Sequence, residues 1–288
     1  GGVGLVSSPG INRNALNQLK ASSANSQVED AAKKSFHHYL FLSFDIVNST
    51  KIKHQLFNEW STIFYDFFNE TISASRTEVA EKLQPGELKP WKVLGDEIVF
   101  KFRLSSLEQI PRLVEVAEAL LKLSSESIKG YVLDLVKSRH SYSTPYTIPD
   151  VKATIWHAKV NEGRPEDIDD SSVCQLIEIP YAPTNYEFIG PDIDIGFRIS
   201  KAAEKRSIVV DLKVAYVLIL YSEHFESQGI PDLSMNLKLK SFEDLKGVWD
   251  EKKYPIILYT LDEASVRSEA PCGIGDELKK YLKELELK

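Results

Sequence analysis

Segments with strand-like and helix-like spacing of apolar residues follow one another along this chain, and their order indicates a sheet covered by helices. The run from His38 to Val47 is aromatic and aliphatic, has the length of a strand, and ends in Asn48-Ser49-Thr50, which favours a turn or a helix cap. Apolar residues then recur three and four positions apart from Leu56 to Ile72, as on one face of a helix. Because such a chain buries its apolar residues between two layers, we expect an α+β fold.

The remaining expected elements come from the same two spacings. Further strands are expected over residues 90–94, 98–102, 151–158, 174–179, 186–189, 207–211, 237–239 and 255–261. Helices are expected from Ser105 to Leu121, with an extension to Val136 beyond a break near Gly130, and from Asp192 to Lys205. We find no internal repeat and no clear linker after residue 36. We therefore expect one catalytic-type domain over residues 36–263, an N-terminal arm over 1–35 and a C-terminal helical tail over 264–288.

Charge and composition exclude several classes of protein. The chain has 288 residues, with 35 Lys and Arg against 42 Asp and Glu, and a net charge of −7. Domains that bind duplexes usually show a basic surface, since counterion release supplies most of their affinity, so nucleic acid is not an expected partner. No apolar run approaches the ~20 residues of a membrane span, and the first residues lack a basic and apolar secretory signal. With two widely separated cysteines, we expect a cytoplasmic protein without a membrane partner.

Two acidic residues stand where packing alone would not place them. Asp45 lies near the end of an apolar run, and Asp96 lies in the bend Gly95-Asp96-Glu97 between two expected strands. A buried carboxylate without a partner is costly, so such a residue pairs, caps a helix or binds a cation. Taken singly, a helix cap for Asp45 and an ordinary turn for Asp96 are the simpler interpretations. As a pair on adjacent strand ends they could hold two divalent ions about 3.5–4 Å apart, which suits in-line displacement at phosphorus.

A third segment, Glu187 to Arg198, combines acidic residues with an arginine. Asp194 and Arg198 are four residues apart on an expected helix, so a surface ion pair is the simple interpretation. Gly196 in this helix costs about 1 kcal/mol relative to alanine, which indicates close packing. An arginine one turn from a phosphate could also stabilise the negative charge of a transition state, because its fork of donors fits phosphate oxygens.

Taken in order, the three segments resemble the motifs of the class III nucleotide cyclase catalytic domain. The family pattern Phe-x-Asp-Ile-x-Gly-Phe-Thr has its counterpart at residues 43–50, Lys-x-x-Gly-Asp at 92–96, and Gly-x-x-Val-Asn-x-Ala-x-Arg at 190–198. The resemblance covers about residues 36–261. It implies the adenylate and guanylate cyclase fold, a ferredoxin-like βαββαβ core with extra strands and with helices packed on a mostly antiparallel sheet.

The resemblance implies a metal site and a reaction. Asp45 and Asp96, helped by the carbonyl of Ile46, would hold two Mg²⁺ or Mn²⁺ ions. These ions would activate the ribose 3′-hydroxyl of a nucleoside triphosphate and neutralise its phosphates. The hydroxyl would then attack the α-phosphorus and release pyrophosphate.

The resemblance also implies residues that act on the nucleotide. Arg198 would steady the crowded phosphoryl intermediate, and Lys92 and Glu187 take the positions of the family's base-reading side chains. In this family the metal aspartates come from one subunit, while the arginine and the base readers come from the other. A head-to-tail homodimer with two composite sites is therefore implied.

Among the departures from the family pattern, four concern the site. Asp194 replaces the ribose-orienting asparagine; it can accept but not donate a hydrogen bond, and it could instead tether Arg198. Phe44 replaces a small residue before the first metal aspartate, which would place a large ring beside the site. Glu187 is one methylene longer than the aspartate typical of adenine readers. Lys246 is displaced by two positions from the late lysine that usually contacts the triphosphate.

Bulkier and longer groups around the base suit a smaller base, and this favours pyrimidine nucleotides. The overall pattern is similar to the bacterial pyrimidine cyclases of the Pycsar antiphage system, which implies conversion of UTP, or of CTP, to a cyclic monophosphate that acts as an alarm signal. Two alternatives stay open. Lys92 supports an ordinary bacterial adenylate cyclase, whereas Asp194 and the displaced Lys246 support a degenerate cyclase domain that only binds nucleotides. The presence of both Asp45 and Asp96 argues against degeneracy.

The other polar residues have simpler interpretations. We expect His37 and His38, which precede the first apolar run, to be edge residues of the sheet. His157 alternates with apolar neighbours in an expected strand, so we expect it to have a structural role. The acidic cluster at residues 167–170 is interpreted as a solvated loop.

Overall fold

A computed structural model describes residues 36–83, 86–138, 146–163, 173–179, 186–247 and 253–261. Within these residues the strands form one nine-stranded sheet with the order β2-β3-β1-β4-β7-β9-β8, to which β5 and β6 are added beside β4. Pairs β4–β5 and β4–β7 are parallel and the other pairs are antiparallel. The expected α+β fold with a mostly antiparallel sheet is therefore confirmed. The arm over 1–35 and the tail over 264–288 lie outside the described residues.

The strands lie close to the expected positions. They are β1 (Phe36–Val47), β2 (Lys89–Leu94), β3 (Glu97–Arg103), β4 (Asp150–Asn161), β5 (Cys174–Glu178), β6 (Tyr186–Ile189), β7 (Ser207–Val210), β8 (Leu237–Glu243) and β9 (Tyr254–Thr260). The strand expected over 237–239 is longer than expected, because pairing with β9 continues as far as Glu243.

Strand β1 lies inside the sheet, between β3 and β4. His38 pairs with Lys159 of β4, and its carbonyl accepts a hydrogen bond from the backbone N–H of Leu104, 2.8 Å away. The expectation that His38 is an edge residue is therefore wrong, since β2 and β8 end the main path of the sheet. The same position of β1 lets its far end meet both of its neighbours, because Asp45 is paired with Glu97 of β3 and with Lys152 of β4.

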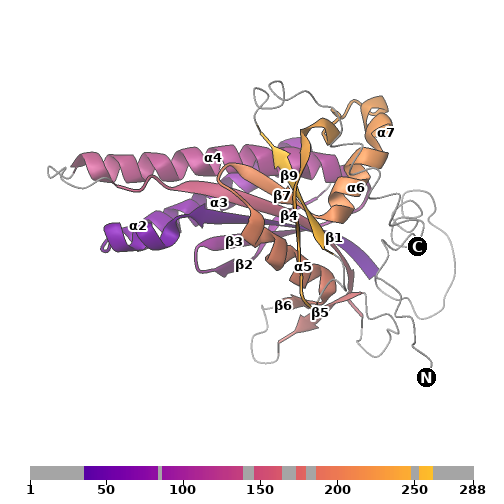
Figure 1. Cartoon of the computed structure of the whole chain (residues 1–288), viewed down its shortest axis with the longest axis horizontal. Helices are drawn as coiled ribbons and strands as arrows, with labels where there is room; N and C mark the ends of the chain where they lie inside the picture. The colour runs from indigo at the N-terminus through magenta and orange to yellow at the C-terminus, as the bar shows by residue number, and fades with distance from the viewer. Residues whose placement is uncertain are drawn as a thin grey trace.

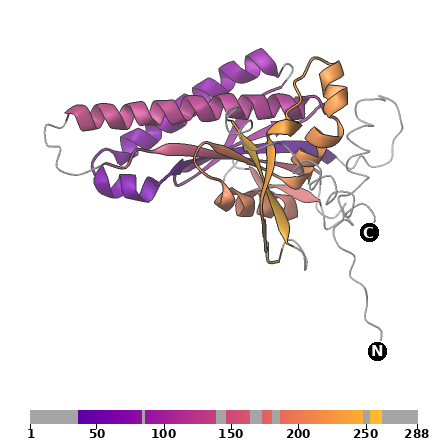
Figure 2. The ribbon, with the colours of Figure 1, turned by 45° about the horizontal axis from the view of Figure 1, so that its top comes forward.

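Helices cover both faces of the sheet. They are α2 (Ser49–Gln55), α3 (Trp60–Lys82), α4 (Gln109–Ser138), α5 (Pro191–Ile199), α6 (Leu212–Leu220) and α7 (Ser222–Ser227), with short 3₁₀ turns η2 (Ser200–Ala202) and η3 (Ser234–Asn236). The long helices α3 and α4 run across one face, and α5 lies against the other (Figures 1 and 2). Among the described residues, no helix is both long enough and apolar enough to span a membrane.

Two helices differ from expectation. Helix α4 continues past Gly130 without a break, because Ile128 and Val132 on either side are buried in the core and hold this turn in place. Helix α5 ends at Ile199, and a 3₁₀ turn replaces the expected continuation to Lys205. The apolar run over 214–221, for which we expected no element, forms most of α6.

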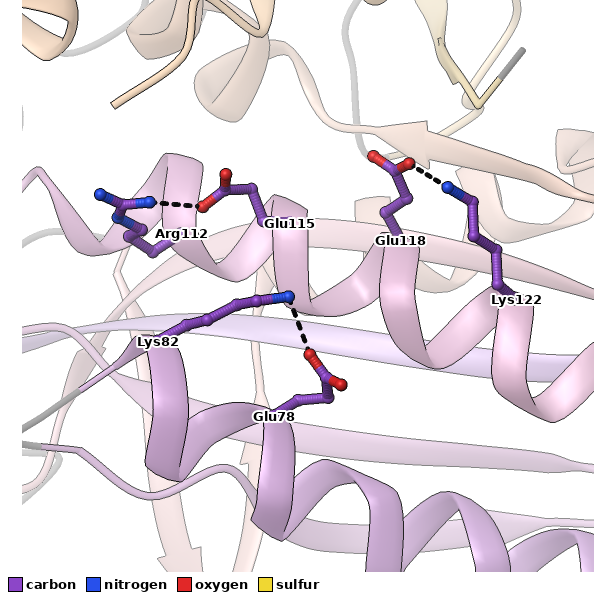
Figure 3. Close-up of polar contacts among 6 residues, drawn as sticks. All are labelled: Glu78, Lys82, Arg112, Glu115, Glu118 and Lys122. Carbon is purple, nitrogen blue, oxygen red and sulfur yellow. Dashed lines mark hydrogen bonds and ion pairs between the residues drawn. The ribbon is translucent and has the colours of Figure 1, made fainter. Parts of the chain in front are cut away.

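Helices α3 and α4 carry ion pairs between residues of the same helix (Figure 3). They are Lys82–Glu78 at 2.8 Å, Arg112–Glu115 at 3.0 Å and Lys122–Glu118 at 2.5 Å. Pairs of this spacing stabilise a helix by about 0.2–0.5 kcal/mol each, so they support α3 and α4 without deciding the fold.

The main apolar core fills the space between the sheet and helices α3, α4 and α6. Phe44 of β1 is completely buried there, and its ring meets that of Phe100 edge to face at a centroid distance of 6.0 Å. A smaller core lies on the opposite face and includes Phe41, Trp156 and Phe188. Helix α5 closes this second core at Gly196, where an added Cβ would overlap the indole of Trp156. The close packing expected at Gly196 is therefore confirmed.

A methyl group at Gly196 should therefore be costly. We expect Gly196→Ala to lower the free energy of unfolding by about 1–3 kcal/mol, because an overpacked core has to shift. The matched control is Gly130→Ala in α4, where an added Cβ meets nothing within 4 Å, so that alanine should instead raise it by up to about 1 kcal/mol. Urea denaturation followed by circular dichroism measures both, and changes of the same sign would contradict the packing described here.

A polar residue closes a gap in the sheet beside β4. This strand pairs with β7 over residues 153–155 and with β5 over 160–161, so β7 and β5 do not meet along its edge. Asp211, just after β7, fills the interval: its carboxylate accepts hydrogen bonds from the backbone N–H of His157 at 2.9 Å and of Val214 at 2.7 Å. The second bond caps the N-terminus of α6.

The imidazole of His157 is buried and pairs with His38 across the strands. The two rings are stacked at a centroid distance of 5.1 Å, with Nε2 of His157 2.9 Å from Nδ1 of His38. Burial lowers the pKa of His38 to about 4 and that of His157 well below its usual value. Both rings are therefore neutral at pH 7, and one donates to the other.

Candidate active site

An open cavity of about 690 Å³ lies beside the C-terminal end of β1. Its walls come from four segments that are remote in sequence: the β1–α2 junction, the β2–β3 bend, the start of β4 and the chain that precedes β7. The lining residues are Asp45, Ile46, Val47, Asn48, Ser49, Thr50, Lys51, Asp96, Lys152, Ala203, Glu204 and Lys205. The three residues expected to hold metal ions, Asp45, Ile46 and Asp96, thus line one cavity.

Local backbone geometry brings the two aspartates together. The β2–β3 bend is closed by Gly95, whose φ of +68° is the left-handed conformation that glycine adopts without strain. The bend places the Asp96 carbonyl 3.4 Å from the backbone N–H of Ile46, which donates to it. Helix α2 begins after Asn48, without a side-chain hydrogen bond at its cap. Asp45 therefore does not cap this helix, and its carboxylate is left to face the cavity.

The carboxylate of Asp45 is held between opposing charges. Its Oδ2 lies 3.0 Å from Nζ of Lys152, and its side chain is 26% exposed. Burial raises the pKa of Asp45, Lys152 counteracts this by lowering it, and the nearby charge of Asp96 raises it further. Two carboxylates at one place repel each other unless a cation lies between or beside them. In the protein alone, Lys152 supplies that positive charge.

A third carboxylate lies beside the pair. Glu97 is opposite Asp45 in the β1–β3 register, and burial raises its pKa, while a hydrogen bond with Ser43 lowers it. Its Oε1 atom is buried and has no hydrogen-bond partner among the described residues. This oxygen adds to the concentration of negative charge around Asp45.

These residues fit a divalent cation that binds together with phosphate. Mg²⁺ and Mn²⁺ prefer oxygen ligands, and Mg²⁺ is usually held by one or two carboxylates and by substrate phosphates rather than by an all-protein cage. Asp45 and Asp96 supply two such carboxylates on one cavity. In the part of the chain that the structure describes, no group of three or more His, Cys, Asp or Glu residues could hold a metal ion by itself. The donor set is therefore incomplete without further oxygens.

The two residues expected to read the base are in contact with each other. Nζ of Lys92, on β2, lies 2.6 Å from Oε1 of Glu187, on β6. The same ammonium lies 4.1 Å from the ring centroid of Trp91, a cation–π contact. Trp91 in turn donates from Nε1 to the carbonyl of Tyr186 at 3.2 Å, which ties β2 to β6. The two motifs that carry Lys92 and Glu187 therefore form one polar group.

Arg198 meets the loop that follows β8. Its Nη1 donates to the carbonyl oxygen of Lys246 at 2.7 Å, and both side chains are exposed. Asp194 is also exposed, and within the described ranges no ion pair joins it to Arg198, whose guanidinium contacts the Lys246 carbonyl instead. In the part of the chain that the structure describes, neither the simple surface pair nor the tether between Asp194 and Arg198 is present. Asp194, Arg198 and Lys246 are absent from the described lining of the cavity, as are Lys92 and Glu187.

The expectation that Phe44 borders the substrate is wrong. Successive side chains of a strand point to opposite faces, so Phe44 cannot share the orientation of Asp45. Its ring is directed into the core below α3 and α4 and has no exposed surface. A large residue at this position serves the core and leaves the shape of the cavity unchanged.

Sequence reasoning missed the lysines of the cavity. Lys51, Lys152 and Lys205 line it together with the aspartates. Lys152 lies in a strand that was expected from its alternating pattern, but nothing local indicates that it faces Asp45. That contact depends on the register between β1 and β4, which decides the pairing of residues far apart in the chain.

No family model matches the sequence, and no curated protein matches it. Solved structures with a similar fold include the guanylyl cyclase Cya2, at 13% identity and a TM-score of 0.47, over 78% of this chain and 91% of that one. Another is the adenylyl cyclase CyaB from P. aeruginosa, at 13% identity and a TM-score of 0.47, over 83% and 98%. An adenylate cyclase from Trypanosoma brucei matches at 12% and 0.47, over 80% and 92%. At this identity, and with these TM-scores below 0.5, the likeness assigns neither an activity nor a substrate to the chain.

Proposed function

We propose that this chain is a nucleotide cyclase that converts UTP, or CTP, to the 3′,5′-cyclic monophosphate and pyrophosphate. The observation that carries the proposal is the meeting of Asp45 and Asp96 on one open cavity. The two residues come from separate strand ends and face a space that can hold a triphosphate. Their positions are those at which the sequence motifs resemble the metal ligands of class III cyclases.

The reaction needs one bond to form and one to break at the α-phosphorus. Two divalent cations bound by Asp45, Asp96 and the Ile46 carbonyl would favour ionisation of the ribose 3′-hydroxyl and neutralise charge on the phosphates. The 3′-oxygen then bonds to the α-phosphorus, and the bond to the β-phosphate oxygen breaks, which releases pyrophosphate. Arg198 would donate hydrogen bonds to the α-phosphoryl oxygens, where negative charge builds up.

A second copy of the chain would complete the site. In one chain, Arg198 and the Lys92–Glu187 pair are absent from the described lining of the cavity that holds the aspartates. Exposed apolar side chains share the strand faces of that pair, since Leu94 of β2 is 44% exposed and Ile189 of β6 is 47% exposed. An apolar surface next to unused polar groups is typical of an interface between subunits. We therefore propose a head-to-tail homodimer with two composite sites.

Mixing two inactive variants tests the composite site. Asp45→Ala and Arg198→Ala each damage both sites of a homodimer, but a mixed dimer keeps one intact site. After subunit exchange at equal concentrations we expect recovery of about a quarter of the parent activity, because half the dimers are mixed and each has one site. Exchange is followed by native mass spectrometry. Mixed dimers that remain inactive would contradict the shared site.

The preference for a pyrimidine rests on the Lys92–Glu187 pair. The longer acid reaches the ammonium directly at 2.6 Å, and the indole of Trp91 lies against the same ammonium. If Lys92 and Glu187 read the base, the longer acid and the indole beside them would leave less room for it, which favours a smaller ring.

The role of the product as a signal in antiphage defence is proposed from the sequence resemblance. The second candidate is an adenylate cyclase, which the presence of a lysine in this pair favours.

The decisive assay offers each of the four nucleoside triphosphates with Mn²⁺ and identifies products by mass spectrometry. We expect a cyclic monophosphate and pyrophosphate from UTP or CTP, and none from Asp45→Ala. A clear preference for ATP would select the second candidate. Absence of turnover of every triphosphate, over a range of metals and concentrations, would overturn the cyclase proposal and favour a domain that only binds nucleotides.

A further inference from the structure

We propose that Lys152 is the resident cation of the cavity, which holds Asp45 until metal and triphosphate arrive and then binds the triphosphate. The inference rests on the proposed function and concerns how that site is loaded. Its consequence is coupling: the metal and the triphosphate bind more tightly together than either binds alone.

The position of Lys152 follows from the sheet. It is directly opposite Asp45 in the β1–β4 register, and both residues line the cavity. Nζ lies 3.0 Å from Oδ2, with the lysine side chain 20% exposed and the aspartate 26% exposed. Such a pair is partly removed from water yet open on the side where a ligand enters. A ligand can therefore compete for either partner without unfolding any element.

The charges of the cavity explain why Lys152 pairs with Asp45. Asp96 is a second carboxylate that lines the same cavity, and Nζ of Lys152 lies 3.0 Å from Oδ2 of Asp45. In the protein alone, the ammonium of Lys152 thus balances the negative charge of Asp45, as a divalent cation does when it is bound. A metal ion that approaches Asp45 must displace the ammonium, so free metal is expected to bind weakly.

A triphosphate removes this obstacle. Its oxygens offer the ammonium a new anionic partner, with hydrogen bonds strengthened by charge. When Lys152 turns to the phosphates, both oxygens of Asp45 become available to the metal, which also binds the phosphates. Each ligand therefore favours the other, and by linkage the gain in affinity is the same in both directions.

A purely structural role for Lys152 predicts something different. Opposite charges on neighbouring strands add slightly to stability. If that were the whole role, loss of the charge would lower the melting temperature slightly and would leave the affinities for metal and triphosphate unchanged. Metal affinity in the absence of phosphate therefore separates the two roles.

The experiment is a titration of the full chain with Mn²⁺, in which free Mn²⁺ is measured by electron paramagnetic resonance. In Lys152→Met we expect Mn²⁺ alone to bind about tenfold more tightly than in the parent, a size typical of coupling between sites. Inorganic tripolyphosphate, measured by calorimetry at saturating Mn²⁺, should bind less tightly in the same variant. This probe has no base and no ribose, so the result does not depend on which nucleotide is the substrate.

Three further variants sharpen the test. Lys51→Met removes the same charge from a lysine that lines the cavity but has no contact with Asp45 among the described residues; Mn²⁺ affinity should change by less than about twofold. Lys152→Arg keeps the charge and should behave as the parent. In an Asp45→Asn background, Lys152→Met should no longer tighten Mn²⁺ binding. Circular dichroism verifies that each variant is folded.

Two results would overturn the inference. Normal Mn²⁺ uptake by the parent, with equal affinities in Lys152→Met, would remove Lys152 from the loading of the site and leave the proposed function standing. Failure of the parent to take up Mn²⁺, with or without tripolyphosphate, would overturn the proposed function together with the inference.

Discussion

Asp45→Asn and Asp96→Asn are each expected to lower cyclase turnover by more than about 100-fold, since each removes a charge on which the metal-bound triphosphate depends. Both carboxylates line one cavity, and the described lining contains one further acidic residue, Glu204. Asparagine keeps the size of the side chain and its ability to accept a hydrogen bond, so the loss measures the charge. Initial rates with Mn²⁺ and the preferred triphosphate provide the measurement.

The thermal stability of Asp96→Asn shows whether a loss of activity comes from the site or from unfolding of the variant. The negative charge of Asp96 raises the pKa of Asp45, so the two groups repel each other when no metal is bound. Loss of that charge should leave the metal-free protein at least as stable in thermal unfolding, while added Mn²⁺ should stabilise the variant less than the parent. Glu78→Gln, in α3 and outside the described lining of the cavity, is the control and should keep parent activity. If Glu78→Gln lost as much activity as the aspartate variants, the loss in those variants would not be specific to the cavity.

Acid is expected to destabilise this protein through the buried pair of His38 and His157. In the unfolded chain each histidine takes up a proton near pH 6.5, whereas burial lowers the folded-state pKa of His38 to about 4 and that of His157 well below 6.5. Between pH 6.5 and 4 the unfolded state therefore binds more protons. The contribution of these two neutral histidines to stability is fully present above pH 6.5. Below that pH, each histidine lowers the free energy of unfolding by about 1.4 kcal/mol per pH unit.

Asp211 acts in the opposite direction. Burial raises its pKa to about 7, so the folded state gains a proton below that pH that the unfolded state binds only near pH 4. The proton that Asp211 binds in the folded state offsets the proton that one histidine binds in the unfolded state. Together, the two histidines and Asp211 leave the unfolded state with about one more bound proton, which sets the slope of the free energy of unfolding against pH. The variant His38→Gln keeps a hydrogen-bonding partner for His157 and removes one titrating group. We expect its slope to be smaller by about 1.4 kcal/mol per pH unit.

Urea denaturation at pH 7, 6 and 5 measures this difference. The comparison between parent and His38→Gln cancels the other acidic groups, which titrate in both proteins. Parallel dependence on pH in the two proteins would show that His38 is protonated in the folded state, which its burial against His157 does not allow.

Local pattern was sufficient for the elements and for the two aspartates that line the cavity. The alternation of apolar residues predicted β1 and β4, and the helical spacing predicted α3 and α4, because these patterns reflect which face of each element is buried. Asp45 and Asp96 were found because each interrupts such a pattern at the end of a strand. Errors followed where a local signal was outweighed by packing: Gly130 did not break α4, since Ile128 and Val132 are anchored in the core.

Other features depended on contacts between remote segments. Phe44 was placed beside the site from its position in a motif, yet the pleat of the strand turns it into the core, where it packs on Phe100. His38 was expected at an edge, and only the strand order shows that β1 is enclosed on both sides. The pair of Lys92 and Glu187 could be inferred from resemblance but not from spacing, because it joins β2 to β6.

By itself the sequence determined that this chain forms a sheet covered by helices and that two aspartates stand at strand ends, since side-chain period and the cost of burying charge are local properties. Only the tertiary structure decided what those aspartates meet. The register of β1 against β4 sets Lys152 beside Asp45, and the path of α5 leaves Arg198 with the loop at Lys246. Register and packing are settled by the burial of whole faces, which no short stretch of sequence contains.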